Sequence, residues 1–262
     1  MSFREKYGPW AVVSGASAGL GACFARDLAA RGLNLVLVAR RADRLEELGR
    51  ELEAGFGVET LAVPLDLCQD GFAGRLVEAV GGREVGLLIN NAGFGATGGF
   101  LEADPAWNAR MVRLNCEATV LLAHAFLPAM VDRGRGGMVM VGSTASFQPC
   151  PWMAVYGATK AFDLMLGEAL DEELRGQGVD VLSLCPGHTD TEFHQVAGVK
   201  GPVAGGSADP AVVVKGALDR LGRKQHWVPG LLNKLMSLGA RFGTRRMGAS
   251  LTGKMLKSRM VG

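Results

Sequence analysis

The sequence predicts a single doubly wound α/β domain, built on a parallel sheet and followed by a basic helical tail. Short apolar runs alternate with longer segments of helical apolar spacing, which is the pattern of β-α-β units. The runs are apolar throughout, as in VLVA and LLIN, so we expect helices to bury both faces of the sheet. The 38 glycines cluster where apolar runs end, which indicates tight strand-to-helix turns.

The expected elements follow one another along the chain. Strands are predicted at residues 11–13, 34–39, 59–63, 85–89, 138–141 and 179–184, with a weaker strand near Trp227. Helices are predicted at residues 21–32, 42–53, 69–80, 105–130 and 151–175, and a further helix follows Asp209. Because parallel strands need crossover connections, this order places helices between successive strands.

Composition favours one soluble, cytoplasmic domain. With 262 residues, 48% hydrophobic and 21% charged, the chain is able to bury one sizeable core, which excludes disorder, collagen-like repeats and a disulfide miniprotein. Five widely spaced cysteines without a CxxC pair indicate neither a disulfide framework nor a zinc site. The first residues lack the apolar core of a signal peptide, and the longest apolar stretch contains His124 and Pro128, so no transmembrane helix is expected.

Charge divides the chain at residue 223. Residues 223–262 carry nine Lys/Arg and no Asp/Glu, whereas residues 1–222 have a net charge of −7. We therefore predict a catalytic body, 1–222, and a basic extension of the same domain, 223–262. An amphipathic helix is expected in the extension, because apolar side chains recur there at helical spacing: Leu231, Leu232, Leu235, Met236 and Phe242.

The apolar stripe of this extension has three interpretations. It could cover a substrate cleft, contact another subunit, or attach residues 231–262 peripherally to a membrane surface. No helix-turn-helix, zinc spacing or aromatic RNA platform accompanies the basic charge, so binding to nucleic acid is not expected.

A glycine-rich turn, Ser14-Gly15-Ala16-Ser17-Ala18-Gly19-Leu20-Gly21, follows the first strand and precedes a helical run. Glycines let the backbone approach a pyrophosphate, and the helix N-terminus presents unpaired N–H groups to it. The GxxxGxG spacing departs from the general GxGxxG pattern, so a plain tight turn is the alternative. We predict a dinucleotide-binding turn, with the contacts at Gly15, Ser17, Gly19, Leu20 and Gly21.

Arg40 and Arg41 stand at the end of the second strand, about 20 residues beyond the turn. Proteins that prefer NAD place an acidic residue there for the ribose hydroxyls, and a carboxylate would repel a 2′-phosphate. Guanidinium groups instead offer charge-assisted hydrogen bonds to that phosphate. The two arginines therefore predict NADP(H) rather than NAD(H), the alternative being a solvated cluster with the charged residues that follow.

Tyr156 and Lys160 are four residues apart in YGATK, hence on one face of a predicted helix. A phenol with an ordinary pKa of about 10 is a poor acid or base near neutrality, but a neighbouring ammonium group favours the phenolate. Ser143 ends the fifth strand, where its hydroxyl is expected to lie beside Tyr156 and to hold a carbonyl oxygen. Together the three residues predict proton transfer at a substrate oxygen, whereas Tyr156 and Lys160 alone fit an ordinary helical pair.

The glycine turn, the NNAG segment, the serine, the YxxxK pair and the PG segment together resemble the short-chain dehydrogenase/reductase superfamily over roughly residues 8–222. The resemblance implies an NADP-dependent oxidoreductase acting on CH–OH or C=O groups, with a Rossmann-type, seven-stranded parallel sheet in the order 3-2-1-4-5-6-7. It implies that Tyr156 is the acid/base, that Lys160 binds ribose and lowers the pKa of Tyr156, and that Ser143 holds the substrate oxygen. Asn115 would complete the tetrad by holding a water that links Lys160 to solvent; the alternative is an asparagine bonded to backbone.

The resemblance also implies further cofactor contacts. Adenine would bind after the third strand at Asp66 and Leu67, although these could also form a turn. The segment after the fourth strand would support the sheet and border the adenine ribose through Asn91, Ala92 and Gly93. The PGHTDT segment after the sixth strand would hold the nicotinamide carboxamide, the matching residues being Pro186, Gly187, Thr189 and Thr191.

Two departures from simpler patterns bear on these expectations. Ser14 stands where the family usually has Thr, and it keeps the hydroxyl. His188 and His194 lack a credible third ligand and the family is metal-free in catalysis, so no metal is expected.

The segments that face substrate in this family are mostly apolar in this chain: Phe94, Phe147, Pro149, Pro151, Trp152, Phe193 and His194. No Arg/Lys cluster accompanies them, which favours a carbonyl or alcohol on a hydrophobic frame. The ARRADRLEEL pattern and the tail are similar to the branch of hydroxysteroid dehydrogenases and long-chain 3-oxoacyl reductases, which implies a lipid-, steroid- or acyl-like substrate. The family also implies a homodimer or homotetramer. The alternative function is a catalytically idle NADPH-binding regulator that acts through its C-terminal tail.

Overall fold

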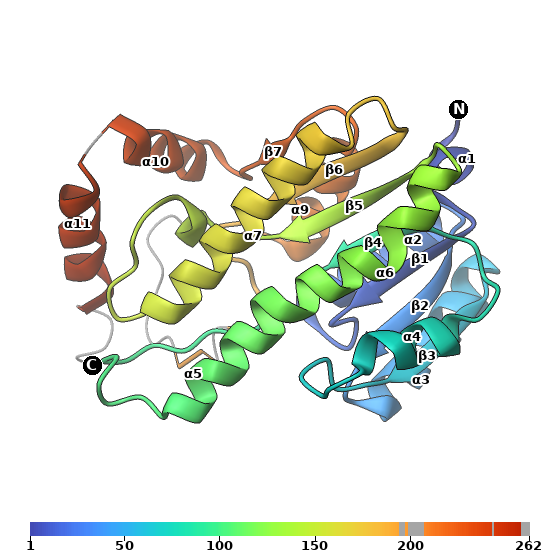
Figure 1. The fold of residues 1–262 in the computed structure, drawn as a ribbon, viewed down its shortest axis with the longest axis horizontal. Helices are drawn as coiled ribbons and strands as arrows, with labels where there is room; N and C mark the ends of the chain where they lie inside the picture. Colours follow the sequence, from blue (N-terminus) through green and yellow to red (C-terminus); the bar gives the residue numbers. More distant parts are fainter. Residues whose placement is uncertain (194–196, 199–206, 243, 258–262) are drawn as a thin grey trace.

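The computed structural model describes residues 1–193, 197–198, 207–242 and 244–257, and for residues 241 and 242 it describes the backbone alone. One parallel sheet of seven strands runs through the molecule in the order β3-β2-β1-β4-β5-β6-β7 (Figure 1). The strands are β1 (Trp10–Ser14), β2 (Asn34–Ala39), β3 (Thr60–Pro64), β4 (Val85–Asn90), β5 (Gly136–Val141), β6 (Val179–Leu184) and β7 (His226–Trp227). The predicted fold class and strand order are confirmed.

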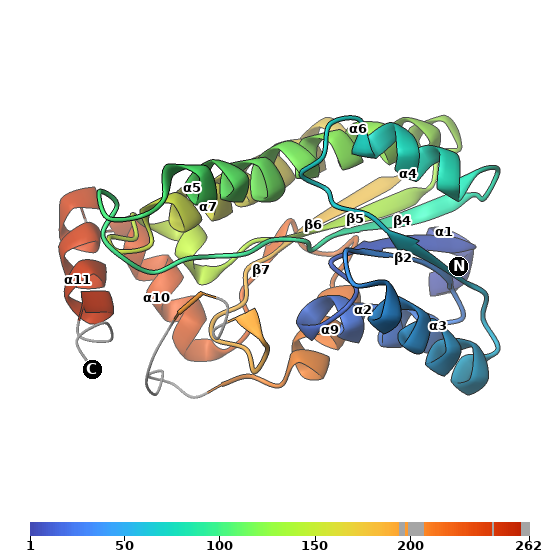
Figure 2. The same ribbon diagram turned by 90° about the horizontal axis from the view of Figure 1, so that it is seen from below.

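Helices cover both faces of the sheet, as Figure 2 shows most clearly. One face carries α2 (Gly19–Ala30), α3 (Ala42–Phe56) and α9 (Pro210–Leu218). The other carries α4 (Phe72–Val80), α5 (Pro105–Val112), α6 (Ala118–Asp132) and α7 (Ala154–Glu173). A short helix, α1 (Phe3–Tyr7), precedes β1 and was not predicted.

Alternate residues of each central strand enter two separate cores. In β1, Ala11 and Val13 belong to the core beneath α2, α3 and α9, whereas Trp10 and Val12 belong to the core beneath α4 and α6. Every residue of β1, β4 and β5 is buried. Two-sided burial is thus the physical reason for the continuous apolar runs, because a strand with one solvated face would alternate with polar residues.

The helix predicted over residues 105–130 is interrupted, and this prediction is corrected. Between α5 and α6 a π-helical turn, η1 (Arg113–Glu117), carries the buried Asn115. Such a turn accommodates an extra residue without breaking the helical run, and it often marks a functional site. Apolar periodicity does not reveal it, because the flanking helices keep the same covered face.

The stretch Pro105–Asp132 is long enough to cross a membrane and contains an 18-residue window with a mean hydropathy of 1.4, so it meets the criterion by length and composition. This is weak evidence for a membrane span, because core helices meet the same criterion. Within the fold, α6 packs against β4, β5 and α4, and α5 packs against α7. The apolar character of the stretch is therefore explained by its position on the sheet.

The basic extension contributes β7 to the sheet edge and then forms two helices, α10 (Leu231–Phe242) and α11 (Arg245–Lys257). They lie beyond the carboxyl ends of the strands, at the opposite side of the molecule from α1 (Figure 1). Their apolar face is not packed away: Leu231, Leu235 and Leu251 are 75%, 57% and 73% exposed. The structure thus places an uncovered apolar surface beside the functional edge of the sheet.

Candidate active site

A cavity of about 1160 Å³ opens at the carboxyl edge of the sheet. Nearly all of the predicted site residues line it: Gly15, Ser17, Gly19, Leu20, Arg40, Arg41, Asp66, Leu67, Asn91, Ala92, Gly93, Ser143, Tyr156, Lys160, Pro186, Gly187, Thr189 and Thr191. Gly21 and Asn115 lie behind this wall rather than in it. The edge location follows from the topology, because all seven parallel strands end on the same side.

The glycine turn forms a tight cradle at the start of α2. Gly15 and Gly19 have left-handed backbones, with φ of 69° and 55°. A Cβ added at Gly21 would lie 2.1 Å from the Gly15 carbonyl oxygen, so only glycine fits there. The N-cap residue Ala18 makes no side-chain cap bond. The N–H groups at this helix start are therefore left for an anion, which fits the pyrophosphate of a dinucleotide.

The Ser14 hydroxyl joins the glycine turn to the segment after β4. It donates to the Ile89 carbonyl (3.0 Å) and accepts from the backbone N–H groups of Asn91 (2.9 Å) and Ala92 (3.0 Å). The Asn91 amide in turn donates to the Ser14 carbonyl at 2.8 Å. These bonds hold the two cofactor-facing loops at a set spacing, and they explain why a hydroxyl residue stands at position 14.

Arg41 is organised toward Ser17 at the outer end of the cavity. Its guanidinium Nε and Nη2 donate to the Ser17 hydroxyl at 3.2 and 3.0 Å. Glu192, from the segment after β6, pairs with Arg41 (3.1 Å) and with Arg44 (2.7 Å). These arginines hold the pKa of Glu192 below its ordinary value, so its carboxylate is charged. The side chain of Arg41, on which the prediction of NADP(H) partly rests, is thus already paired with the carboxylate of Glu192.

Asp66 is engaged by the chain itself at the adenine end of the cavity. Its carboxylate accepts from the Cys68 N–H (3.0 Å) and from the Arg110 guanidinium (2.7 Å). Partial burial raises the pKa of Asp66, but these two donors outweigh burial and hold the pKa below its ordinary value. Arg110 was not predicted, because it comes from α5, far from Asp66 in sequence.

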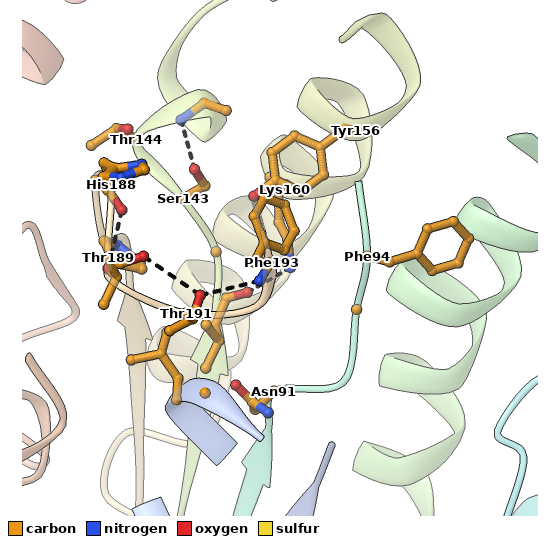
Figure 3. A pocket seen from close by; sticks show the side chains of 18 of the residues that line it. Asn91, Phe94, Ser143, Thr144, Tyr156, Lys160, His188, Thr189, Thr191 and Phe193 are labelled. Atoms are coloured by element: carbon orange, nitrogen blue, oxygen red, sulfur yellow. Dashed lines mark hydrogen bonds between the residues drawn. The ribbon is translucent and has the colours of Figure 1, made fainter. Parts of the chain in front are cut away.

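Tyr156, Lys160 and Ser143 meet at the inner end of the cavity (Figure 3). Lys160 is buried, and its Nζ donates to the Val141 carbonyl (2.7 Å) and to the carboxylate of Asp163 (2.9 Å). The Ser143 hydroxyl lines the same part of the cavity as Tyr156 and accepts from the Ala145 N–H at 3.1 Å. The end of β5 and the first turns of α7 thus supply a phenol, an ammonium group and a hydroxyl on one wall.

The protonation of Tyr156 differs from the simple expectation that Lys160 brings its pKa toward neutrality. Burial raises the pKa of Tyr156; Lys160 and the hydrogen bond from Ser143 act in the opposite direction without offsetting burial. Phe193 contributes to that burial, with its ring centroid 5.3 Å from the Tyr156 ring (Figure 3). At neutral pH Tyr156 is therefore a phenol, which is a proton donor.

Asn115 holds the loop after β4 against α7. Its amide Nδ2 donates to the Phe94 carbonyl and to the Thr159 hydroxyl, both at 2.9 Å, and its Oδ1 accepts from the Phe94 N–H at 3.1 Å. A Cβ added at Gly93 would lie 3.1 Å from Asn115 Oδ1 and 3.5 Å from Lys160 Nζ. The side-chain bonds to the Phe94 backbone agree with the alternative interpretation, in which Asn115 is an asparagine bonded to backbone. A role of Asn115 in holding a water stays a prediction.

The PGHTDT segment lies between the glycine turn and the tail. Thr191 faces Gly19, where an added Cβ would be 3.2 Å from its side chain, and a Cβ added at Gly187 would be 2.4 Å from Asn233 Nδ2 of α10. Thr189 is buried. The basic extension therefore contacts the segment that is expected to hold the nicotinamide. This contact agrees with one of the three interpretations of the extension, that it covers a substrate cleft.

Several expected substrate-facing residues lie elsewhere. Phe94, Phe147 and Phe193 line the cavity, but Pro149, Pro151 and Trp152 do not, and His194 lies outside the described residues. Lys257 of α11 lies 5.4 Å over the Trp152 ring, because the loop after β5 turns outward onto the tail. In their place the tail helices supply apolar wall residues. Leu231, Leu232 and Met236 belong to the stripe that the sequence offered as a cover for a substrate cleft, whereas Met255 and Leu256 were not assigned.

Besides Arg110, sequence reasoning missed two acidic residues at the site, Asp163 and Glu192. The sequence contains an indication of Asp163, because it follows Lys160 by three residues on one helix. An acidic residue at that spacing, however, is typical of an ordinary helical ion pair. The sequence contains no such indication of Glu192, because its pairing with Arg41 spans 151 positions. Among the described residues, no group of three His, Cys, Asp or Glu side chains is arranged to hold a metal ion.

A parallel α/β sheet with a phosphate-binding turn and a tyrosine–lysine–serine group at its carboxyl edge defines a dinucleotide-dependent oxidoreductase. The profile of the short chain dehydrogenase family matches residues 9–199, and the chain belongs to this family. It is an oxidoreductase acting on CH–OH or C=O groups.

Two relatives illustrate the range of the match. The chain is 34% identical to 7beta-hydroxysteroid dehydrogenase of Clostridium sardiniense over 235 residues, covering 89% of this chain and 90% of that protein. It is 30% identical to human very-long-chain 3-oxoacyl-CoA reductase over 233 residues, covering 87% of this chain and 73% of that protein.

Two solved structures superpose closely on this chain. A 7beta-hydroxysteroid dehydrogenase superposes with a TM-score of 0.89 at 29% identity, covering 97% of this chain and 100% of that one. A short-chain dehydrogenase from Sphingobium yanoikuyae in complex with NADPH superposes with a TM-score of 0.81 at 36% identity, covering 90% and 94%.

Proposed function

We propose that the chain is an NADP(H)-dependent oxidoreductase that interconverts a carbonyl and a secondary alcohol on an apolar, lipid-, steroid- or acyl-like substrate, with Tyr156 as acid/base. The observation that carries this proposal is the buried Tyr156 beside Lys160 and Ser143 in the wall of a partly apolar cavity. Two relatives named for hydroxysteroid and 3-oxoacyl-CoA substrates support the substrate class.

The residues present fit a bound dinucleotide. Its pyrophosphate would lie on the glycine turn, its adenine beside Asp66 and Leu67, and its nicotinamide carboxamide near Thr189 and Thr191. When bound, the cofactor supplies or accepts the hydride. The uncapped start of α2 and the close approach at Gly21 support this placement.

The chain's own residues handle the proton. Ser143 donates a hydrogen bond to the carbonyl oxygen and so orients it. In reduction Tyr156 transfers its hydroxyl proton to that oxygen, and the ammonium group of Lys160 stabilises the phenolate that remains. In oxidation the phenolate takes the proton from the alcohol, so the same groups serve both directions.

The proposed function is tested by following NADPH consumption with a panel of carbonyl compounds. We expect turnover of steroid ketones, 3-oxoacyl esters and long-chain ketones, and little turnover of sugar ketones, because the cavity wall is lined by aromatic and aliphatic side chains. If no member of the panel reacts while NADPH still binds, the regulator alternative is favoured over the enzyme.

We further propose that Arg40 and Arg41 select NADP(H) over NAD(H). Both line the cavity at the end of β2, where they are able to meet a 2′-phosphate. A family member of known structure in complex with NADPH supports this preference.

The pairing of Glu192 with Arg41 and Arg44 leads to a specific prediction. The Glu192 carboxylate competes with a 2′-phosphate for the same guanidinium group, so Glu192→Gln is expected to tighten NADPH binding about two- to fivefold. NADH binding should not change, because NADH lacks that phosphate. Fluorescence titration of both cofactors measures this effect.

Asp190→Asn is the matched control for this variant. Asp190 is an exposed carboxylate of the same segment and forms no ion pair with any described residue. Unchanged or weaker NADPH binding by Glu192→Gln, or an equal gain for NADH, would contradict the competition.

We also propose that the tail contacts the surface of an anionic membrane peripherally. The exposed apolar residues of α10 and α11 stand beside basic side chains such as Lys234, Arg246 and Lys254, and these attract anionic headgroups. The full chain should sediment with anionic but not zwitterionic vesicles, and salt or Leu235→Ser/Leu251→Ser should release it. Sedimentation independent of lipid charge would argue against this contact. Cytoplasmic location and a homo-oligomer stay predictions.

A further inference from the structure

Asp163 is a buried carboxylate next to the reacting groups that the proposed mechanism does not use. It lies on α7, three residues after Lys160, and its side chain is 5% exposed. Its Oδ2 accepts from Lys160 Nζ at 2.9 Å, whereas its Oδ1 has no hydrogen-bond partner among the described residues. Burying a carboxylate with one unpaired oxygen is costly, so a position of this kind calls for an explanation.

The pair fixes the position of the Lys160 ammonium group. Lys160 Nζ also donates to the Val141 carbonyl at 2.7 Å, so two of its three donors are bound by the chain. The same Nζ lies at the cavity wall, 3.5 Å from a Cβ that would be added at Gly93. Asp163 therefore reaches the cavity through Lys160 and not by lining it.

Asp163 is also the negative charge that acts on Tyr156. The ionisable groups around Tyr156 and Lys160 are Asp163 and the thiols of Cys116, Cys150 and Cys185. Burial raises the pKa of these thiols to about 11, 11 and 12, so they are neutral at neutral pH. Among the described residues in contact with this group, Lys160 and Asp163 form the ion pair, and the two have opposite effects on Tyr156. Burial raises the pKa of the Asp163 carboxyl, and the adjacent Lys160 ammonium group acts against that rise.

We propose that Asp163 is a positioning residue that holds the Lys160 ammonium group at the cavity floor and keeps Tyr156 in its protonated form, so that the chain is set for reduction. The inference rests on the proposed role of Tyr156 as acid/base. Lys160 alone would favour the phenolate, which is the base needed for alcohol oxidation, whereas the nearby carboxylate offsets this influence and favours the phenol, which is the acid needed for carbonyl reduction.

The chain offers a direct spectroscopic test, because Tyr7 and Tyr156 are its only tyrosines. Tyr7 donates to Asp180, and burial followed by this bond raises its pKa far above the ordinary value. In a Tyr7→Phe background, the near-ultraviolet absorption of tyrosinate therefore reports the ionisation of Tyr156. We expect Asp163→Asn in this background to ionise Tyr156 at a lower pH than the parent does.

Asp171→Asn provides the matched control, because Asp171 is a carboxylate on the same helix that pairs with Arg175 away from the cavity. This control should leave the titration of Tyr156 unchanged. In activity assays at pH 7, Asp163→Asn should raise the rate of alcohol oxidation about three- to tenfold relative to the parent, because more Tyr156 is then phenolate.

An unchanged titration, or one displaced to higher pH, overturns the proposal; the second result would mean that Lys160 loses its proton when Asp163 is replaced. If the Asn variant does not fold, as judged by circular dichroism, Asp163→Leu replaces it, because an apolar side chain of similar size needs no hydrogen bond. The titration reads Tyr156 whether or not the protein turns over. Its outcome is therefore separate from a failure of the proposed function, which activity retained by Tyr156→Phe would reveal.

Discussion

Replacing Tyr156 with Phe is expected to lower kcat by about 10²–10⁴-fold while NADPH binding is retained. The substitution removes the hydroxyl proton but keeps the ring that packs against Phe193. Steady-state kinetics and a parallel fluorescence titration of NADPH measure the two effects. Tyr7→Phe, at the only other tyrosine, should leave turnover near that of the parent.

The pH dependence of the reduction and oxidation rates should also identify Tyr156 as the acid/base. Because burial keeps Tyr156 protonated, the reduction rate should hold through neutral pH and fall as pH rises through the pKa of Tyr156, whereas the oxidation rate should rise over the same range. Turnover retained by Tyr156→Phe, or a profile that does not change in this variant, would assign the proton to another group.

Arg41→Ala is expected to weaken NADPH binding about tenfold and to leave NADH binding nearly unchanged. Arg41 is only half-buried, so solvent screens its attraction for a phosphate and limits the loss. The measurement is the ratio of the Kd values for the two cofactors in parent and variant.

Arg44→Ala is the companion control. Arg44 shares Glu192 with Arg41 but does not line the cavity, so its removal should change NADPH affinity much less. An equal loss of NADPH and NADH affinity in Arg41→Ala would show that the substitution damages the turn at Ser17 rather than a phosphate contact.

Some features of the site are determined by residues that are close in sequence, and others by contacts between distant segments. The glycine turn is local: Gly15 and Gly19 adopt the left-handed backbone within a few residues of one another. The Tyr156–Lys160 pair is local as well, since a helix brings residues four apart onto one face. Patterns of this kind are readable because neighbours in sequence are neighbours in space.

Other features depend on packing between distant segments. The π-helical turn at Asn115 accompanies a bond to Thr159 of another helix, and the ion pair of Glu192 joins the segment after β6 to α3. The outward turn of Trp152 onto α11 likewise needs the tail in place. No periodicity records these contacts, because each involves partners that meet only after the sheet has assembled.

The sequence by itself determined the parallel sheet, its strand order through family resemblance, and a set of site residues nearly all of which line the cavity. Apolar periodicity and glycine spacing express burial and backbone freedom, which are local properties. Only the tertiary structure decided the protonation of Tyr156, the burial of Asp163 and the occupation of Arg41 by a carboxylate. These depend on desolvation and on charges brought together from separate elements, and the free energy of a charge is set by its surroundings in space rather than by its place in the chain.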